Sequence, residues 1–255
     1  MLVILPYCDA DQHLAVQLLD WIAELGGCKK HTLLLITDPK LEATRIEAVQ
    51  KSARKSFKAI TQITTPYRRR RADGSSGWPL NCNWAFYCAC MYVAMTGRKP
   101  FLWLEPDCVP LKGGWLDELE SDYELCGEEF MGDVIETKVV GMVEKYLNGT
   151  AIYPGTAMRH FDSHMVDLLN GHNDAFDMAS AKTVVPMTSA TLKIQHWFRV
   201  EGEPAPSFDP DPPAGWETIV LANIRPEAVL FHDCKDGSLI RKLREIRKEA
   251  TLVAA

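Results

Sequence analysis

Short apolar segments alternate with helical patterns in the first quarter of the chain, and this alternation restricts the fold more than any other feature. The segments Leu2–Leu5, Thr32–Ile36 and Ala59–Ile63 have the length of strands, and the first two are mainly apolar. Between them, residues 14–25 carry apolar side chains at helical spacing, and residues 41–57 form a basic amphipathic segment. A β-α-β-α-β order of this kind predicts a mostly parallel sheet flanked by helices, and therefore an α/β fold.

A fourth apolar run, Phe101–Leu104, leads directly into two carboxylates, Glu105 and Asp107, with Pro106 between them. In open parallel sheets, ligands bind beyond the carboxyl ends of the strands. If this run is the fourth strand, both acids lie at that edge, where hard oxygen ligands can hold Mg²⁺ or Mn²⁺ against a substrate diphosphate. The competing interpretation is a solvated turn that contains a proline.

A second charged cluster follows a late apolar run, Ala228–Phe231. His232 comes directly after this run and can offer a neutral imidazole to a metal. Lys235 can contact a phosphate as a compact positive charge. The competing interpretation is an ordinary turn at Asp236 and Gly237, beside an exposed histidine.

A long basic loop is predicted at residues 64–81, where glycine, serine and the run Arg68–Arg71 are concentrated. Loops of this length in compact domains are usually functional or disordered, so the arginines are either phosphate contacts or a solvated face. A buried helix over Asn81–Thr96 follows, with an inward face that we assign to Trp84, Cys88, Met91, Tyr92 and Met95.

The pattern is less regular after the acidic pair. Helices are predicted at residues 115–125, 156–169, 174–182 and 239–249, and strands at 130–136 and 151–153. Residues 201–216 are rich in proline, aspartate and glycine, which predicts a loop. Phe208 and Trp216 are its candidates for a lid over a binding site.

The composition excludes some classes of protein. The net charge is −6, from 28 basic and 34 acidic residues, and gives no general attraction to nucleic acids or anionic membranes. The longest uncharged apolar run, Trp84–Met95, is shorter than a membrane span, and the first residues lack the features of a signal peptide. The eight cysteines show no repeated Cys-x-x-Cys spacing, which favours reduced thiols over a zinc site. We expect a cytoplasmic protein with no membrane partner.

Taken together, these segments resemble a GT-A glycosyltransferase. The resemblance is carried by the acidic pair after the fourth strand, by the late histidine with a lysine three residues on, and by the segments "GWPLNCNWAF" and "NGTAIYPGTAM". It spans most of residues 1–240, and the chain is closest in size to small soluble transferases of bacteria and bacteriophages. The sequence departs from the usual pattern at Glu105, where aspartate is common, and no Pro-Trp pair follows Lys235.

The resemblance implies transfer of a sugar from a nucleotide-sugar donor, with a UDP-sugar as the first choice, to a hydroxyl acceptor. Asp107 and His232 would bind Mn²⁺ or Mg²⁺, and Glu105 would contact the metal or the donor ribose. The remaining donor contacts would be made by Pro6, Tyr7, Arg68, Trp78, Asn83 and Lys235.

An inverting reaction would also need a general base to deprotonate the acceptor hydroxyl. Asp177 lies after the segment that resembles the acceptor side of these enzymes, and we select it for this role. Asp174 and Asp133 are its rivals, although Asp174 also fits a helix N-cap.

One domain is expected over residues 1–240, divided into a nucleotide-sugar half at 1–110 and an acceptor and metal half at 111–240. A charged helix would follow at 241–255. The acceptor is either a glycan or a hydroxymethylated base of phage DNA. The residues that could follow the DNA backbone are Arg68–Arg71, Lys51, Arg54, Lys55 and Lys58. Two alternatives remain: a sugar-nucleotide nucleotidyltransferase, whose Gly-rich phosphate loop is missing here, and a degenerate, non-catalytic binding module.

Overall fold

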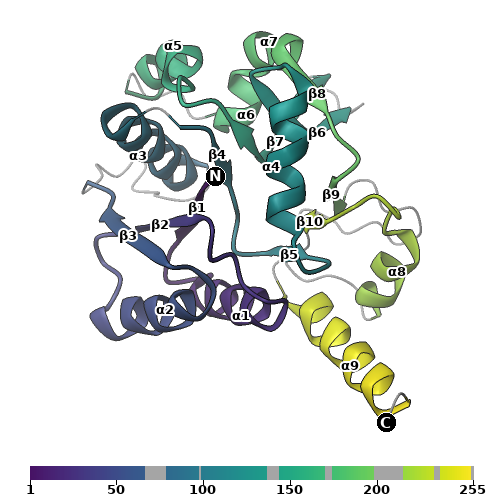
Figure 1. Ribbon diagram of the computed structural model, residues 1–255. Coiled ribbons are helices and arrows are strands. Elements are labelled where there is room, and N and C mark those ends of the chain that lie inside the picture. The colour runs from purple at the N-terminus through teal and green to yellow at the C-terminus, as the bar shows by residue number, and fades with distance from the viewer. Residues whose placement is uncertain are drawn as a thin grey trace.

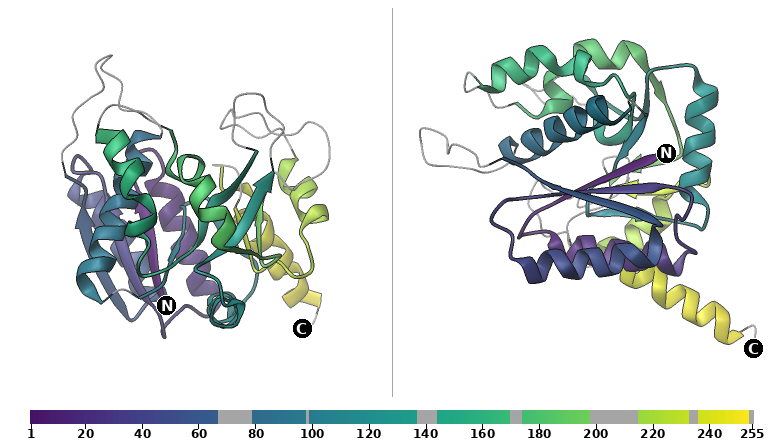
Figure 2. Two further views of the ribbon diagram at one scale, coloured as in Figure 1. Left: turned by 90° about the horizontal axis from the view of Figure 1, so that it is seen from above. Right: turned by 60° about the vertical axis from the view of Figure 1, so that its left-hand side comes forward.

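The computed structural model describes residues 1–66, 79–97, 99–136, 144–169, 174–197, 215–232 and 236–253. These residues form a seven-stranded sheet and a separate three-stranded sheet. Helices cover both faces of the larger sheet (Figures 1 and 2). The predicted α/β fold with a mostly parallel sheet is therefore confirmed. Among the described residues, no helix is long and apolar enough to span a membrane.

The larger sheet joins a parallel half to a mixed half. In spatial order its strands are β3 (Ala59–Thr64), β2 (Thr32–Thr37), β1 (Leu2–Tyr7), β4 (Phe101–Trp103), β7 (Lys145–Tyr153), β6 (Phe130–Glu136) and β8 (Thr188–Ala190). The first four are parallel to one another, whereas β7 is antiparallel to both β4 and β6. The short strand predicted at 151–153 is the end of a much longer one, because Asn148 and Gly149 interrupt its apolar pattern.

The helices of the first half also follow the prediction closely. They are α1 (Gln12–Glu24), α2 (Ala43–Ser56) and α3 (Leu80–Thr96). Figure 2 shows α1 and α2 on one face of the sheet and α3 on the other. Gly26 and Gly27 both adopt positive φ, and their left-handed backbone ends α1 as the sequence predicts.

The predicted inward face of α3 is wrong at Met91 and Met95, whereas Trp84 and Tyr92 are half-buried and pack against the core as predicted. Met91 and Met95 are exposed, while Phe86, Cys90 and Val93 are buried. Apolar side chains occur all round this helix, so its spacing does not select a face. The choice is made by an aromatic cluster around Phe86, whose ring contacts the rings of Phe101, Trp103, Tyr153, Phe161 and Phe176.

The later helices are mostly short. They are α4 (Trp115–Cys126), α5 (Met158–Leu169), α6 (Phe176–Ala179), α7 (Ala181–Val184), α8 (Trp216–Asn223) and α9 (Ser238–Val253). The single helix predicted at 174–182 is thus two, separated at Ser180. The C-terminal helix α9 extends away from both sheets (Figure 1).

The smaller sheet was largely missed by the sequence pattern. It consists of β5 (Cys108–Pro110), β10 (Leu230–His232) and β9 (Ile194–His196), in that spatial order. Strands of three residues are too short to show a period, and only β10 was predicted. The register places Cys108, His232 and His196 side by side across the three strands, so their side chains share one face.

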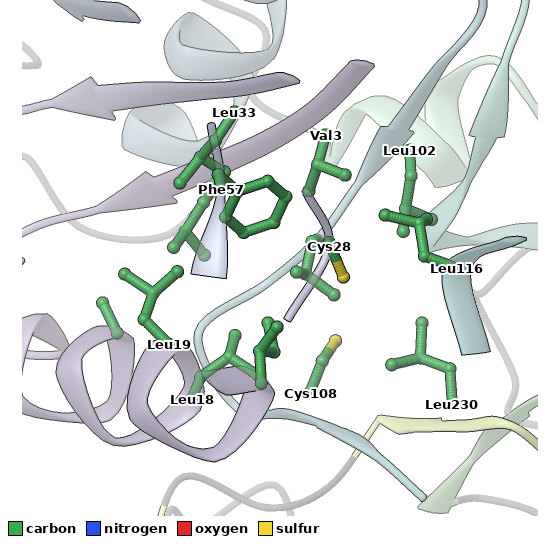
Figure 3. Close-up of a cluster of buried hydrophobic side chains, with 14 of the residues drawn as sticks. Val3, Leu18, Leu19, Cys28, Leu33, Phe57, Leu102, Cys108, Leu116 and Leu230 are labelled. Carbon is green, nitrogen blue, oxygen red and sulfur yellow. The ribbon is translucent and has the colours of Figure 1, made fainter. Parts of the chain in front are cut away.

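The two sheets share a hydrophobic core. Figure 3 shows Cys108 of β5 and Leu230 of β10 gathered with Val3, Leu18 and Leu33 of the larger sheet and its helices. This packing fixes the small sheet against the end of β4.

Trp216 lies in a second buried cluster, with Trp21, Val109 and Phe231. Because its side chain is buried there, Trp216 is not a lid residue, and that prediction is wrong. The other lid candidate, Phe208, lies outside the described residues.

Candidate active site

The acidic pair occupies the turn that carries the chain from β4 to β5. The backbone N–H of Cys108 donates to the carbonyl of Glu105 at 3.0 Å and closes this turn. Asp107 is buried, with 7% of its surface exposed, and Glu105 is half-buried. The exposed turn that was the competing interpretation is therefore excluded: both acids lie at the carboxyl edge of the large sheet, as expected.

His232 brings a third polar group to the same point. It ends β10 directly opposite Cys108, and its Nε2 lies 3.4 Å from Asp107 Oδ1 and 3.5 Å from Glu105 Oε2. These separations exceed those of ordinary hydrogen bonds, about 2.7–3.2 Å. They suit two ligands that share one cation at metal–ligand distances of about 2.0–2.2 Å. The structure thus brings the three predicted metal ligands together.

The electrostatics of this group favour a bound cation. Burial alone would lower the pKa of His232, but the charges of Asp107 and Glu105 outweigh it and raise the pKa to about 10. Two carboxylates in a confined site therefore carry an excess of negative charge that a proton or a metal ion must balance. A divalent cation meets this requirement with oxygen and nitrogen ligands.

Cys108 lies close to the same ligands, and its thiol is neutral in the metal-free protein. Its Sγ falls within 4.8 Å of the ligand atoms of Asp107 and His232. Burial, together with the negative charge of Asp107, raises the pKa of this thiol well above its usual value. Its Sγ is also 3.2 Å from Thr150 Oγ1, in hydrogen-bonding range. The two carboxylates are hard oxygen ligands, and together with the imidazole they fit Mn²⁺ or Mg²⁺.

Asn148 is a site residue that the sequence analysis missed. It lies in β7, and its Oδ1 is 3.0 Å from Nδ1 of His232. The same oxygen accepts the backbone N–H of Thr150 at 3.1 Å. The available signal was a buried polar side chain between the apolar residues of "KYLNGTAIY".

Asp177, the predicted base, reaches the site from the first turn of α6. Its Oδ1 accepts the backbone N–H of Met178 at 2.9 Å. A Cβ added at Gly149 would lie 2.8 Å from Glu105 Oε1 and 3.8 Å from Asp177 Oδ2, so the two carboxylates meet over this glycine. Burial and the charge of Glu105 raise the pKa of Asp177 to about 7.

The rival bases are placed differently. Asp174 is exposed, and its backbone carbonyl accepts the side-chain amide of Asn83. Its predicted N-cap role is wrong, because the residue that precedes α6 is Ala175. Asp133 is buried, and its Oδ2 accepts the backbone N–H of His196 at 3.1 Å. A register shift in β6 at Asp133 turns this side chain towards β9.

A cavity of about 340 Å³ opens beside the acidic pair, at the carboxyl ends of β1, β2 and β4. Pro6, Tyr7 and Glu105 line it, as the predicted donor contacts should. The Tyr7 hydroxyl is buried and has no hydrogen-bond partner among the described residues. Two carboxylates that we did not select, Asp11 and Asp38, also line this cavity.

Of the other predicted donor contacts, only Asn83 lies among the described residues, and it does not line this cavity. Asn83 is fully buried, and its amide holds the segment before Asp177 through Asp174 O at 2.8 Å and Phe176 N at 2.9 Å. Any effect of Asn83 on a donor would therefore be indirect. Arg68, Trp78 and Lys235 lie outside the described residues, as do Arg69–Arg71.

No protein-family model matches the chain, and no curated protein matches it at a significant level. Solved structures do share its fold. The galactosyltransferase LgtC, in complex with donor and acceptor sugar analogues, superposes with a TM-score of 0.56 at 12% identity, over 95% of each chain. The bifunctional glycosyltransferase WbbM gives 0.55 at 11% identity, over 90% of this chain and 45% of that one. The glycosyltransferase GlyE of Streptococcus pneumoniae gives a TM-score of 0.50 at 8% identity, over 90% of this chain and 54% of that one.

These likenesses identify the class of fold. The chain has the GT-A glycosyltransferase fold, as the resemblance in the sequence implies. The site described above lies at the edge of the sheet where open α/β folds bind their ligands.

Proposed function

We propose that the protein is a metal-dependent glycosyltransferase that moves a sugar from a nucleotide-sugar donor to a hydroxyl group. The observation that carries this proposal is the convergence of Glu105, Asp107 and His232 beside a cavity at the carboxyl edge of the sheet. The likeness to LgtC, whose structure contains donor and acceptor sugar analogues, supports the same reaction class.

Mn²⁺ or Mg²⁺ is the cofactor that these ligands fit. Asp107 and His232 would bind the ion directly, and Glu105 would bind it directly or hold the donor ribose. When bound, the ion supplies positive charge next to the diphosphate that leaves with the nucleotide. Lys235, three residues after His232, stays a predicted diphosphate contact.

The cavity lined by Pro6 and Tyr7 is the proposed place of the nucleotide base. Asp38 follows β2 and can accept hydrogen bonds from ribose hydroxyls. A UDP-sugar remains our first choice of donor.

Asp177 is the proposed general base for the acceptor hydroxyl. A carboxyl group whose pKa is about 7 is substantially ionised at neutral pH and still basic enough to accept a proton. This role applies to an inverting reaction, so the anomeric configuration of the product tests it.

A glycan hydroxyl is the acceptor that we favour. The other candidate, a hydroxymethylated base of phage DNA, relies on basic residues of α2 and on the arginine run. In α2, Lys55 is already paired with Asp20 at 2.8 Å, which reduces the positive charge available to DNA. A phosphate-tracking surface is therefore poorly supported among the described residues.

Two further alternatives are less well supported. A sugar-nucleotide nucleotidyltransferase would need a Gly-rich phosphate loop after β1, which "CDADQH" does not provide. A non-catalytic binding module would not need three candidate metal ligands, Glu105, Asp107 and His232, at one point. It would also not need a carboxyl group, that of Asp177, with a pKa raised to about 7.

The decisive experiment measures nucleoside diphosphate released from UDP-, GDP- and ADP-sugars, with Mn²⁺ and with EDTA. We expect release from one donor that requires the metal. The matched variant replaces both Glu105 and Asp107 with alanine. If metal-dependent release persists in this variant, the site assignment is wrong, and if no donor is turned over or bound, the transferase proposal is wrong.

A further inference from the structure

Asn148 lies behind His232, on the side of the imidazole ring away from the acids. Only 5% of its surface is exposed, and most of the other residues of its strand, β7, are apolar. A buried amide needs hydrogen-bond partners to offset the loss of water. Asn148 has two at its oxygen: His232 Nδ1 at 3.0 Å and the backbone nitrogen of Thr150 at 3.1 Å.

The Thr150 contact determines which way the Asn148 amide points. A backbone N–H can only donate, so the side-chain atom that faces Thr150 must be the oxygen. The same oxygen faces His232 Nδ1, which must therefore carry a hydrogen. When the imidazole is neutral, its lone pair is then on Nε2, the atom that faces Asp107 and Glu105.

We propose that Asn148 is a positioning residue that fixes the tautomer and rotation of the His232 ring for metal binding. Metal-bound histidines commonly donate their second N–H to a fixed acceptor, which orients the ring and increases its basicity as a ligand. The ring of His196 packs edge-on against His232, at 4.8 Å between centroids, and limits its movement from another side. The inference rests on the metal of the proposed function.

The residue that follows Asn148 acts on a second ligand. Gly149 lies against the Glu105 carboxylate, where a side chain would collide with it. Two consecutive residues of β7 thus serve two different ligands: Asn148 orients His232, and Gly149 leaves room for Glu105. The pair Asn148 and Gly149 therefore positions two of the proposed metal ligands.

The test is the affinity of the full chain for Mn²⁺, measured by calorimetry without donor. Asn148→Leu and Asn148→Ala remove the acceptor, and each should weaken binding by roughly 10–100-fold. Asn148→Asp keeps an acceptor for both N–H groups, and it should bind Mn²⁺ at least as tightly as the wild type. Ser56→Ala is the control for lost stability, because it removes a buried hydrogen bond to Leu19 far from the site and should leave the affinity unchanged.

A second measurement detects which nitrogen of the His232 imidazole carries the hydrogen. In the Mg²⁺-saturated wild type, ¹⁵N NMR should show His232 with a slowly exchanging hydrogen on Nδ1, and this signal should be lost in Asn148→Ala and kept in Asn148→Asp. Equal Mn²⁺ affinities in the wild type, Asn148→Leu and Asn148→Ala would overturn the role of Asn148 and leave the proposed function intact. A wild-type chain without affinity for Mn²⁺ or Mg²⁺ would overturn the metal dependence of the proposed function as well.

Discussion

The carboxylates of Glu105 and Asp177 approach one another over the bare backbone of Gly149. They come from opposite parts of the chain, one from the end of β4 and the other from the start of α6. An added Cβ would be 2.8 Å from the first and 3.8 Å from the second. A proposed metal ligand and a candidate base therefore lie over the same glycine, and the charge of Glu105 helps to raise the pKa of Asp177.

Gly149→Ala should disable the site with little effect on the fold. The new methyl group would displace the Glu105 carboxylate, and we expect turnover to fall by at least about tenfold, as misplacement of a reacting group usually causes. Donor turnover and circular dichroism check this. Adding Glu105→Asp, which shortens the carboxylate, should restore part of the loss, and no restoration would contradict the steric explanation.

Asp177 should make the reaction depend on pH near neutrality. A base must be ionised, so transfer should rise through an apparent pKa of about 7 and level off above it. Asp177→Asn should abolish this transfer and leave Mn²⁺ affinity nearly unchanged. An Asp177→Asn variant with the wild-type rate would exclude Asp177 as the base.

Ionisation of Asp177 should increase activity as the pH rises, but it should lower the stability of the folded protein. Its folded pKa is raised, so the contribution of Asp177 is fully present below its unfolded pKa, near 3.9, and is lost as pH rises towards about 7. In metal-free protein at pH 8, Asp177→Asn should therefore raise the melting temperature, by roughly 2–4 °C for each kcal/mol of destabilisation that it removes. At pH 4 the two proteins should melt together, and an equal difference at both pH values would refute the pKa shift.

Asp107 and Glu105 should not be equally important. Asp107 is the more buried and is the expected direct ligand, whereas Glu105 can act through water or on the ribose. Removing a ligand charge in a buried site costs most, so Asp107→Asn should weaken Mn²⁺ binding by on the order of 100-fold and Glu105→Gln by about tenfold. Calorimetry on both variants compares them directly, and the reverse order would assign the roles the other way.

Cys108→Ala should leave Mn²⁺ affinity within about twofold of the wild type, because the Cys108 Sγ is engaged with Thr150 Oγ1 at 3.2 Å. The loss of a buried sulfur should still cost about 1 kcal/mol of the free energy of unfolding, measured with urea. A large loss of affinity in a stably folded variant would instead make Cys108 a ligand.

The parallel half of the fold could be predicted largely because β1, β2 and β4 are short, mainly apolar runs. β2 shows this, since Leu33, Leu34 and Leu35 are all covered by helices and neighbouring strands. Because ligands bind beyond the carboxyl ends of parallel strands, Glu105 and Asp107 could then be placed at a ligand-binding edge. The position of His232 came from the resemblance to a known fold, since nothing local connects it to Asp107 over so long a stretch of chain.

The rest depends on tertiary contacts that have no local signature. Asn148 looks like an ordinary polar residue until the fold places it against His232. β5 and β9 are too short to show a period, and the inward face of α3 is chosen by the aromatic cluster around Phe86. Asn83 illustrates the same limit, because its burial and its bonds to the start of α6 could not be read from its neighbours.

The proposed ligands do not all belong to one sheet. The chain leaves the large sheet at Trp103 and enters the small one at Cys108, while His232 belongs to the small sheet alone. A cation held by the acids and His232 would therefore cross-link the two sheets. Its affinity should then depend on packing far from any ligand. A substitution such as Trp216→Ala, which loosens the cluster beneath Phe231 in β10, should weaken metal binding without touching the site.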